Sequence, residues 1–342
     1  MTTTAPPYEL FTVADFALEC GVVLPEARLA YHLSGSPDAS PPLLTCTAFS
    51  QNYEDLAYLR GPGLALDPSR HWIIHTELLG NGRSSSPSNT PSLAGPDFPP
   101  VTIRDNVRLQ RALLSHLGVE RVAAVIGASM GGQQAIQWAV SYPEQVERAV
   151  IIVGSGRATW HARLFLDSLA GCIRSDPAFA EGRYLSPPLE GLSRMSATWA
   201  PWAFSPQFYA TEQYQRYEDT RADNLAEFLT KWRSRYHQKD ANDLLCQLAM
   251  WSGHDVSHTP GGDGTLATAL GRVQAQVLYL PCRTDAYFAV PDVEAEAALV
   301  SQAQVRVIES INGHAAGFGR SPADRRQINT AVAWFLDDEK GL

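Results

Sequence analysis

The feature that most constrains this chain is a short turn at 127–131 (Gly-Ala-Ser-Met-Gly). The apolar run Val122–Ile126 before it is typical of a strand buried on both faces, and Gln133–Val140 after it has a helical pattern. A serine between such a strand and helix is the G-x-S-x-G nucleophile elbow, which holds the hydroxyl at the top of a parallel sheet. The turn therefore predicts Ser129 as a nucleophile.

The glycines of this turn have a steric explanation. A serine at the tip of such a turn needs an unusual backbone conformation, and Gly127 and Gly131 keep side chains out of the contact between strand and helix. The N-terminus of the helix also favours negative charge near Ser129. A chance Gly/Ser turn is the alternative, but it would not need both flanking elements.

Strand-like and helix-like segments alternate on both sides of the elbow. Strands are predicted at 28–33, 43–48, 71–75, 122–126, 149–153, 276–280 and 305–309, and helices at 102–117, 133–140, 292–301 and 325–335. This alternation predicts the α/β class, a mostly parallel sheet flanked by helices. With the elbow, it predicts an α/β-hydrolase fold.

The segment 155–260 has a different pattern. It shows no strand signal, and helices are predicted at 163–173, 207–217, 224–237 and 241–251. We interpret it as a helical cap inserted into the core, which then comprises 1–154 and 261–342. Five of the eight tryptophans lie in the cap. Most are expected to pack within it, and the others to line a pocket.

The elbow also predicts an acid that follows the serine along the chain. Asp285 lies in the loop after the predicted strand 276–280, where the acid belongs. Asp292 competes with it, but Asp292 follows Pro291 and is interpreted as the N-terminal cap of a helix. We therefore predict Asp285 as the acid.

Nine histidines compete for the role of the base, which should come last. His314 lies on the loop after the predicted strand 305–309, downstream of Asp285. The others are His32, His71, His75, His116, His161, His237, His254 and His258. They lie in or beside early strands, in predicted helices or in the cap, where packing or a surface position explains them. We predict His314 as the base.

Such a triad performs acyl transfer. The acid orients the imidazole, and the imidazole removes the serine proton as Oγ attacks an acyl carbonyl. Two N–H groups must stabilise the oxyanion that forms. The first is that of Met130, which follows the nucleophile, and Phe49, after the strand 43–48, is the candidate for the second, although no HGGG sequence occurs here.

Beyond the elbow, the chain resembles the homoserine O-acetyltransferase family of α/β-hydrolases. The shared segments are 65–67, 98–99, 101–105, 118–121, 129–132, 144–148, 240–242, 254–255 and 313–314, with Asp285 and Phe288. The resemblance implies an α/β-hydrolase core, a helical cap, a Ser-Asp-His triad and a homodimer joined through the cap.

The chain also departs from this family at three places. Ala315 follows the predicted base where the family has an acidic residue, and Gln238 stands where it has arginine. The segment 46–51 reads Cys-Thr-Ala-Phe-Ser-Gln in place of Cys-His-Ala-Leu-Thr-Gly. The loop 80–91 is more similar to a branch labelled as hydrolases.

These departures bear on the acceptor. A homoserine acceptor brings an ammonium and a carboxylate into a partly dehydrated pocket, where each needs an opposite charge. Gln238 and Ala315 cannot supply one. Arg233 and Arg235 lie on the same predicted helix and could compensate, but we interpret them as exposed helix cations. We therefore expect that homoserine is not acetylated.

Three functions fit these observations to different degrees. A serine hydrolase would cleave an ester, thioester or amide through an acyl-Ser129 intermediate. An acyltransferase would pass the same acyl group from acyl-CoA, as a co-substrate, to an alcohol. A repurposed, non-hydrolytic fold would need no complete triad. We favour the hydrolase, with a small-molecule acyl substrate, no cofactor and no metal.

Bulk properties limit the partners and the compartment. The net charge of −9, without a Lys/Arg run, argues against nucleic acid. No apolar run approaches the ~18–20 residues of a membrane span, and the first residues do not resemble a signal peptide. Five scattered cysteines without C-x-x-C spacing suggest reduced thiols. We expect a cytoplasmic protein that binds no membrane.

Overall fold

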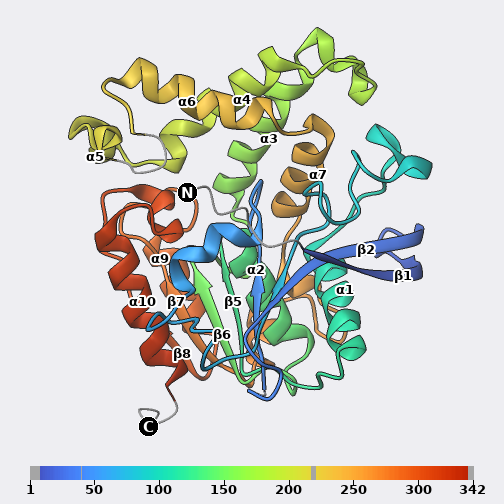
Figure 1. Cartoon of the computed structure of the whole chain (residues 1–342), viewed down its shortest axis with the longest axis vertical. Coiled ribbons are helices and arrows are strands. Elements are labelled where there is room, and N and C mark those ends of the chain that lie inside the picture. Colours follow the sequence, from blue (N-terminus) through green and yellow to red (C-terminus); the bar gives the residue numbers. More distant parts are fainter. Residues whose placement is uncertain (1–7, 40, 217–220, 338–342) are drawn as a thin grey trace.

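The computed structural model describes residues 8–39, 41–216 and 221–337. Its strands form one eight-stranded sheet in the order β1-β2-β4-β3-β5-β6-β7-β8 (Figure 1). Their bounds are β1 Glu9–Ala17, β2 Val23–Ser34, β3 Leu43–Cys46, β4 Ile73–Thr76, β5 Ala124–Ala128, β6 Arg148–Ile152, β7 Gln276–Leu280 and β8 Ala303–Val305. The pairs β1–β2 and β2–β4 are antiparallel and the others parallel. The predicted α/β-hydrolase fold is confirmed.

Different helices cover the two faces of the sheet. The core helices are α1 Ile103–His116, α2 Met130–Ser141, α8 Leu266–Gly271, α9 Val290–Ala297 and α10 Pro322–Leu336. Successive side chains of a strand point to opposite faces. In β5, Val125 accordingly belongs to the cluster with α1 and α2, whereas Ala124 and Ile126 belong to the cluster with α10. Both faces are buried, so the strands read as continuous apolar runs.

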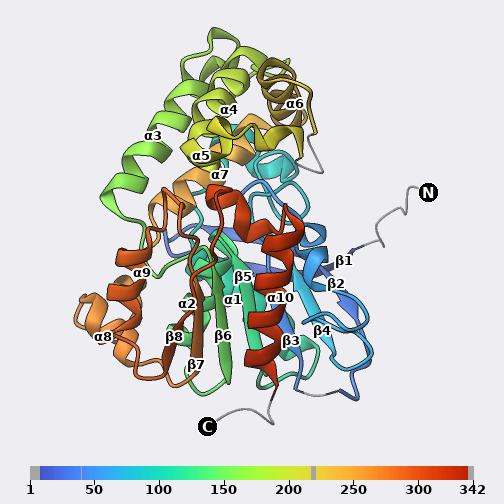
Figure 2. The ribbon, with the colours of Figure 1, turned by 90° about the vertical axis from the view of Figure 1, so that its left-hand side faces the viewer.

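A group of helices stands above the sheet, between β6 and β7 in the chain (Figures 1 and 2). They are α3 Trp160–Arg174, α4 Leu189–Ala203, α5 Pro206–Ala210, α6 Leu225–His237 and α7 Ala241–Ser252. Aromatic rings pack between these helices. The centroid of the Phe204 ring lies 4.3 Å from that of Phe208 and 5.3 Å from that of Trp232. Among the described residues of 155–260 there is no strand.

The sequence patterns do not predict two elements, β1 and α4. Most side chains of the edge strand β1 are exposed, and its apolar alternation covers only Phe11 and Val13 before Asp15 interrupts it. The helix α4 contains Pro201, which disfavours a helical prediction. The spacing of Leu192, Met195 and Trp199, all buried on α4, is a signal that could have identified it.

The predicted bounds of one helix and one strand are wrong. The last residue of the helix predicted at 207–217 lies outside the described residues, and the rest is only the short α5 followed by a 3-10 turn, Gln213–Gln215. The strand predicted at 305–309 ends at Val305, and only an isolated bridge joins Ile308 to Cys282. None of the helices in the described part of the chain has the length and apolar character that crossing a membrane requires.

Candidate active site

Ser129 occupies the turn between β5 and α2 with φ 55° and ψ −120°. A non-glycine residue rarely adopts a positive φ, and such strain clusters at functional sites. The glycines make the turn possible: a Cβ on Gly127 would lie 2.1 Å from the Gly131 backbone, and one on Gly131 would lie 2.3 Å from the carbonyl oxygen of Cys46. The steric explanation predicted for these glycines is confirmed.

The structure brings the three predicted side chains together. The Nε2 atom of His314 lies 3.0 Å from Oγ of Ser129, and its Nδ1 atom lies 2.7 Å from Oδ2 of Asp285. All three residues are buried. They come from the loops after β5 and β7 and from the 3-10 helix Gly313–Phe318, which precedes α10. The arrangement has the order and contacts of a serine–histidine–acid triad.

The acid is fixed by backbone groups. The N–H groups of Tyr287 and Phe288 donate to Oδ1 of Asp285 at 2.8 and 3.3 Å, which leaves Oδ2 for the imidazole. The Tyr287 ring also packs edge-on against His314, with centroids 4.5 Å apart. These contacts restrict the rotation of both side chains.

A hydroxyl joins the two loops that carry the acid and the base. Thr284 Oγ1 donates to the carbonyl of Ser310 at 2.9 Å and accepts the N–H of Gly313 at 3.1 Å. The cap approaches the same place, because a Cβ on Gly313 would lie 2.8 Å from the backbone nitrogen of Ser205. The position of His314 therefore depends on both core and cap.

Two N–H groups lie where the oxyanion donors are predicted. Met130 is the first residue of α2, and the first N–H groups of a helix lack an intrahelical acceptor. Phe49 lines the same cavity as Ser129 and His314. Within the described residues, no acceptor takes the N–H of Phe49. Both groups are thus available to a ligand.

Two glutamines that sequence reasoning misses hold the loop of Phe49. Gln247, on α7, accepts the N–H of Ser50 at 2.8 Å and donates to the Gly80 carbonyl at 2.7 Å. Gln134, on α2, donates to the carbonyl of Thr47 at 2.8 Å. Gln134 lies 87 residues from Thr47 in the chain, and Gln247 lies 197 residues from Ser50, so no short-range sequence pattern links them.

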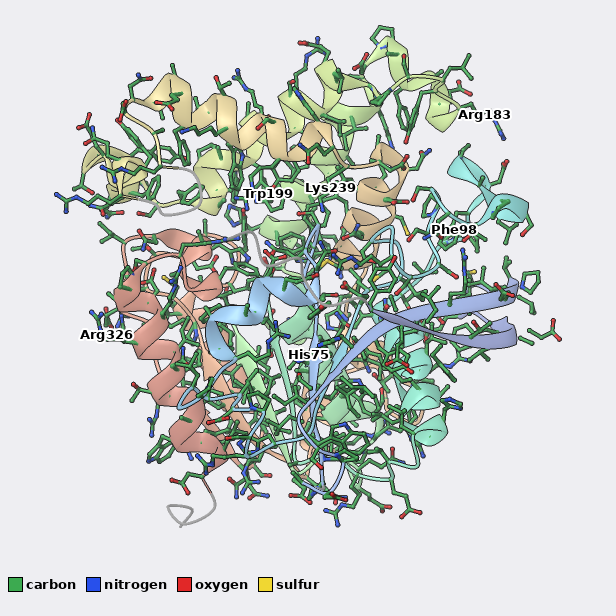
Figure 3. All side chains as sticks on the ribbon, in the orientation of Figure 1. His75, Phe98, Arg183, Trp199, Lys239 and Arg326 are labelled. Atoms are coloured by element: carbon green, nitrogen blue, oxygen red, sulfur yellow. The ribbon has the colours of Figure 1, made fainter. Side chains whose placement is uncertain are left out.

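A cavity of about 260 Å³ opens beside the triad. Ser129 and His314 form its floor from the core, and Trp199 and Trp232 belong to its wall from the cap. In Figure 3, Trp199 is labelled between the cap helices and the core. Side chains of the segment 155–260 and the nucleophile thus line one pocket.

Two positions at which the chain departs from the homoserine O-acetyltransferase family also line this cavity. Both Gln238 and Ala315 belong to its wall. Arg235 does too, so its interpretation as an exposed helix cation is wrong, whereas Arg233 is exposed. The sequence could not separate the two arginines, because the end of α6 turns one toward the cavity and the other away.

The competing residues lie elsewhere. Asp292 is exposed in the first turn of α9, and Ala289 is the N-cap, so the capping role predicted for Asp292 is wrong. His75 is buried between the hydroxyls of Ser34 and Thr45, each 2.7 Å from a ring nitrogen. Burial, reinforced by the charge of Arg60, lowers the pKa of His75 to about 3. It is a neutral packing residue.

Known proteins share this fold and sequence. The chain matches the alpha/beta hydrolase fold family over residues 41–318. It is 37% identical over 338 residues to an ethyl acetate hydrolase of Pseudomonas veronii, across 96% of this chain and 95% of that protein. A homoserine O-acetyltransferase of Nostoc punctiforme is 29% identical, across 87% and 88%. The solved acetylester hydrolase of Corynebacterium glutamicum has a TM-score of 0.92 and 36% identity, with 96% of each chain covered.

Proposed function

The chain belongs to the α/β-hydrolase fold family, and on that premise we propose that it cleaves acetyl esters of small alcohols through an acyl-Ser129 intermediate. The observation that carries the proposal is the chain of contacts from Asp285 through His314 to Ser129. The names of its relatives, an ethyl acetate hydrolase and an acetylester hydrolase, support a short acyl group.

The proposed mechanism has two stages. In the first, His314 takes the proton of Ser129 as Oγ attacks the acyl carbonyl, and the N–H groups of Met130 and Phe49 stabilise the oxyanion. His314 then returns the proton to the leaving alcohol. In the second, water attacks the acyl-enzyme with His314 again as base, which releases the acid and restores the serine. Asp285 orients the imidazole and stabilises its cation throughout.

The second candidate is an acyltransferase, which the similarity to a homoserine O-acetyltransferase favours. The two reactions share the triad and differ in whether water or an alcohol takes the acyl group. We propose hydrolysis because Ala315 leaves the cavity without the acidic group that follows the base in the acetyltransferase family, although Arg235 still supplies a positive charge. Neither reaction needs a cofactor, and only the transferase uses acyl-CoA as co-substrate.

The test compares the two acceptors directly. Purified protein is incubated with 4-nitrophenyl acetate, with and without a primary alcohol, and separately with acetyl-CoA and homoserine. We expect acetate as the main product of the first reaction, and no homoserine-dependent thiol release in the second. Thiol release at typical enzyme rates, on the order of 1 per second, would replace the hydrolase with the transferase.

The assembly and compartment are part of the same proposal. Two apolar side chains one turn apart on α3, Trp160 and Leu164, are 79% and 71% exposed. They support a homodimer joined through the cap, because a partner chain could cover adjacent exposed apolar side chains. All five cysteines are free, which supports a cytoplasmic location.

A further inference from the structure

The cavity beside Ser129 is positively charged although the chain is acidic. Arg235, Lys239 and Arg320 line it together with one carboxylate, Asp55, whereas the whole chain carries a formal charge of −9. A neutral acetyl ester gives no reason for three cations around so small a space. A cation that pairs with a carboxylate of the protein stabilises the fold, whereas an unpaired cation is available to a ligand.

One of the three cations is already paired. Arg320 lies 3.7 Å from Asp55, and the same carboxylate accepts the backbone N–H of Asn52 at 2.9 Å. Asp55 is therefore committed to the protein itself. This pair closes one side of the cavity without adding net charge.

The other two cations have no such partner. Within the described residues, neither Arg235 nor Lys239 forms a side-chain hydrogen bond or an ion pair, and Arg235 only faces the ring of Trp232 at 6.0 Å. Burial lowers the pKa of Lys239, and the charges of Arg83 and Arg235 act in the same direction, against Asp55 and Glu77. Lys239 and Trp199, both labelled in Figure 3, line the same cavity.

Helix geometry alone does not account for this pair. Cations in the last turn of a helix commonly complement its dipole, and Arg235 lies in the last turn of α6. His237 lies in the same last turn, whereas Lys239 lies beyond the end of the helix. Two unpaired cations that line one cavity are therefore available to bind an anion from outside the protein.

We propose that the physiological substrate is a small acetyl ester that carries a carboxylate, which Arg235 and Lys239 bind while Ser129 attacks the ester. This inference rests on the proposed esterase function. A monoanion fits better than a zwitterion such as an amino acid, because the acidic group that lines the cavity, Asp55, is already paired. The guanidinium can bind the carboxylate through two parallel hydrogen bonds, and the ammonium adds a point charge.

The test uses three esters of one shape. They are 4-acetoxybutanoate, its neutral amide 4-acetoxybutanamide, and O-acetylhomoserine, which adds an ammonium to the first. Acetate release gives kcat and KM for each with the wild type, Arg235→Gln, Lys239→Gln and the double variant. Arg233→Gln, two residues away and exposed, is the matched control, and thermal midpoints show that each variant folds.

We expect the wild type to favour the carboxylate over the amide by ~10-fold or more in kcat/KM, mainly through KM, which corresponds to about 1.4 kcal/mol. The ratio should fall toward one in the double variant, persist in Arg233→Gln and decrease with added salt. O-acetylhomoserine should be the poorer of the two acids. Equal efficiency on the acid and the amide, or a ratio unchanged in the double variant, would overturn the inference.

The two proposals can fail separately. Hydrolysis of 4-nitrophenyl acetate without preference for the carboxylate would leave the esterase in place and remove the carboxylate subsite. Loss of hydrolysis of all four esters would contradict the proposed function, and the subsite inference would fail with it.

Discussion

At the scale of single residues, the site depends on side chains whose hydrogen-bond partners and backbone conformation are fixed by their neighbours. The carboxylate of Asp285 uses one oxygen for two backbone N–H groups and the other for His314. The strained backbone of Ser129 exists only because the neighbouring glycines have no Cβ. Small changes at these positions should therefore affect activity far more than folding.

Replacing the acid tests this most simply. In Asp285→Asn the side-chain oxygen can still accept the backbone N–H groups, but the amide now donates to Nδ1 of His314 and favours the wrong tautomer. We expect kcat for 4-nitrophenyl acetate to fall by about 10⁴-fold, the loss typical of such a substitution, with an unchanged thermal midpoint. Asp292→Asn is the control, since Asp292 is exposed. Similar activity in the two variants would remove Asp285 from the triad.

At the scale of elements, buried polar side chains tie the helices to the sheet. Glu296, on α9, accepts the N–H of Gly156 at 2.7 Å and the hydroxyl of Tyr279, on β7, at 3.0 Å. Burial raises the pKa of its carboxyl from 4.5 to about 7, with smaller opposing effects from these two donors. The contact joins α9, β7 and the start of the cap segment.

This pKa predicts a pH-dependent stability. A raised pKa means that the folded protein favours the protonated carboxyl, so its contribution is full below pH 4.5 and is lost as the pH rises through about 7. In Glu296→Gln a neutral amide replaces the carboxyl, and the variant should gain on the wild type between pH 5 and 8, by about 3 kcal/mol at most. Urea unfolding at both pH values measures the difference.

The control for this experiment is Glu294→Gln on the same helix, where the side chain is exposed. Other carboxyls with raised pKa values, those of Glu77 and Asp243, titrate equally in every variant and cancel in the comparison. A stability difference for Glu296→Gln that stays constant or shrinks with rising pH would show that its carboxyl is not desolvated.

Because the cap forms one wall of the cavity, a smaller side chain there should change the preference for acyl-chain length. Trp199, on α4, lines the cavity, lies 4.9 Å from the Phe49 ring and donates to the hydroxyl of Tyr287. In Trp199→Leu the lost ring volume should raise the kcat/KM ratio of 4-nitrophenyl butanoate to acetate several-fold, because the wall recedes. Trp202→Leu, which loses a ring packed on Phe165 instead, should leave the ratio unchanged; equal shifts in both would mean that the cap does not set substrate size.

At the scale of the whole molecule, the exposed apolar pair on the cap predicts the assembly. Light scattering should give the wild type twice the mass of one chain. Trp160→Glu should give the mass of one chain, since a carboxylate cannot be buried without a partner. A single-chain mass for the wild type at micromolar concentration would contradict the homodimer.

How much of the molecule could be predicted follows from the range of the forces involved. The elbow, the strands β5 to β7 and the order of Ser129, Asp285 and His314 come from local patterns and a known chain order, and the sequence contains both. The apolar alternation of the edge strand β1 is too short to identify it, and α4 contains a proline. Which side of α6 faces the cavity, and where the residues after it lie, depends on tertiary packing, so the sequence does not show that Arg235 and Lys239 line the cavity.

The central claim is that Ser129 is the nucleophile of an esterase, and covalent labelling tests it most directly. The wild type is treated with diethyl 4-nitrophenyl phosphate, and the modified residue is located by mass spectrometry of peptides. We predict one adduct per chain on Ser129, loss of activity in proportion to labelling, and neither adduct nor activity in Ser129→Ala. In Ser50→Ala, which removes the other cavity serine, the adduct should remain. An adduct on another residue, or esterase activity in folded Ser129→Ala, would contradict the account.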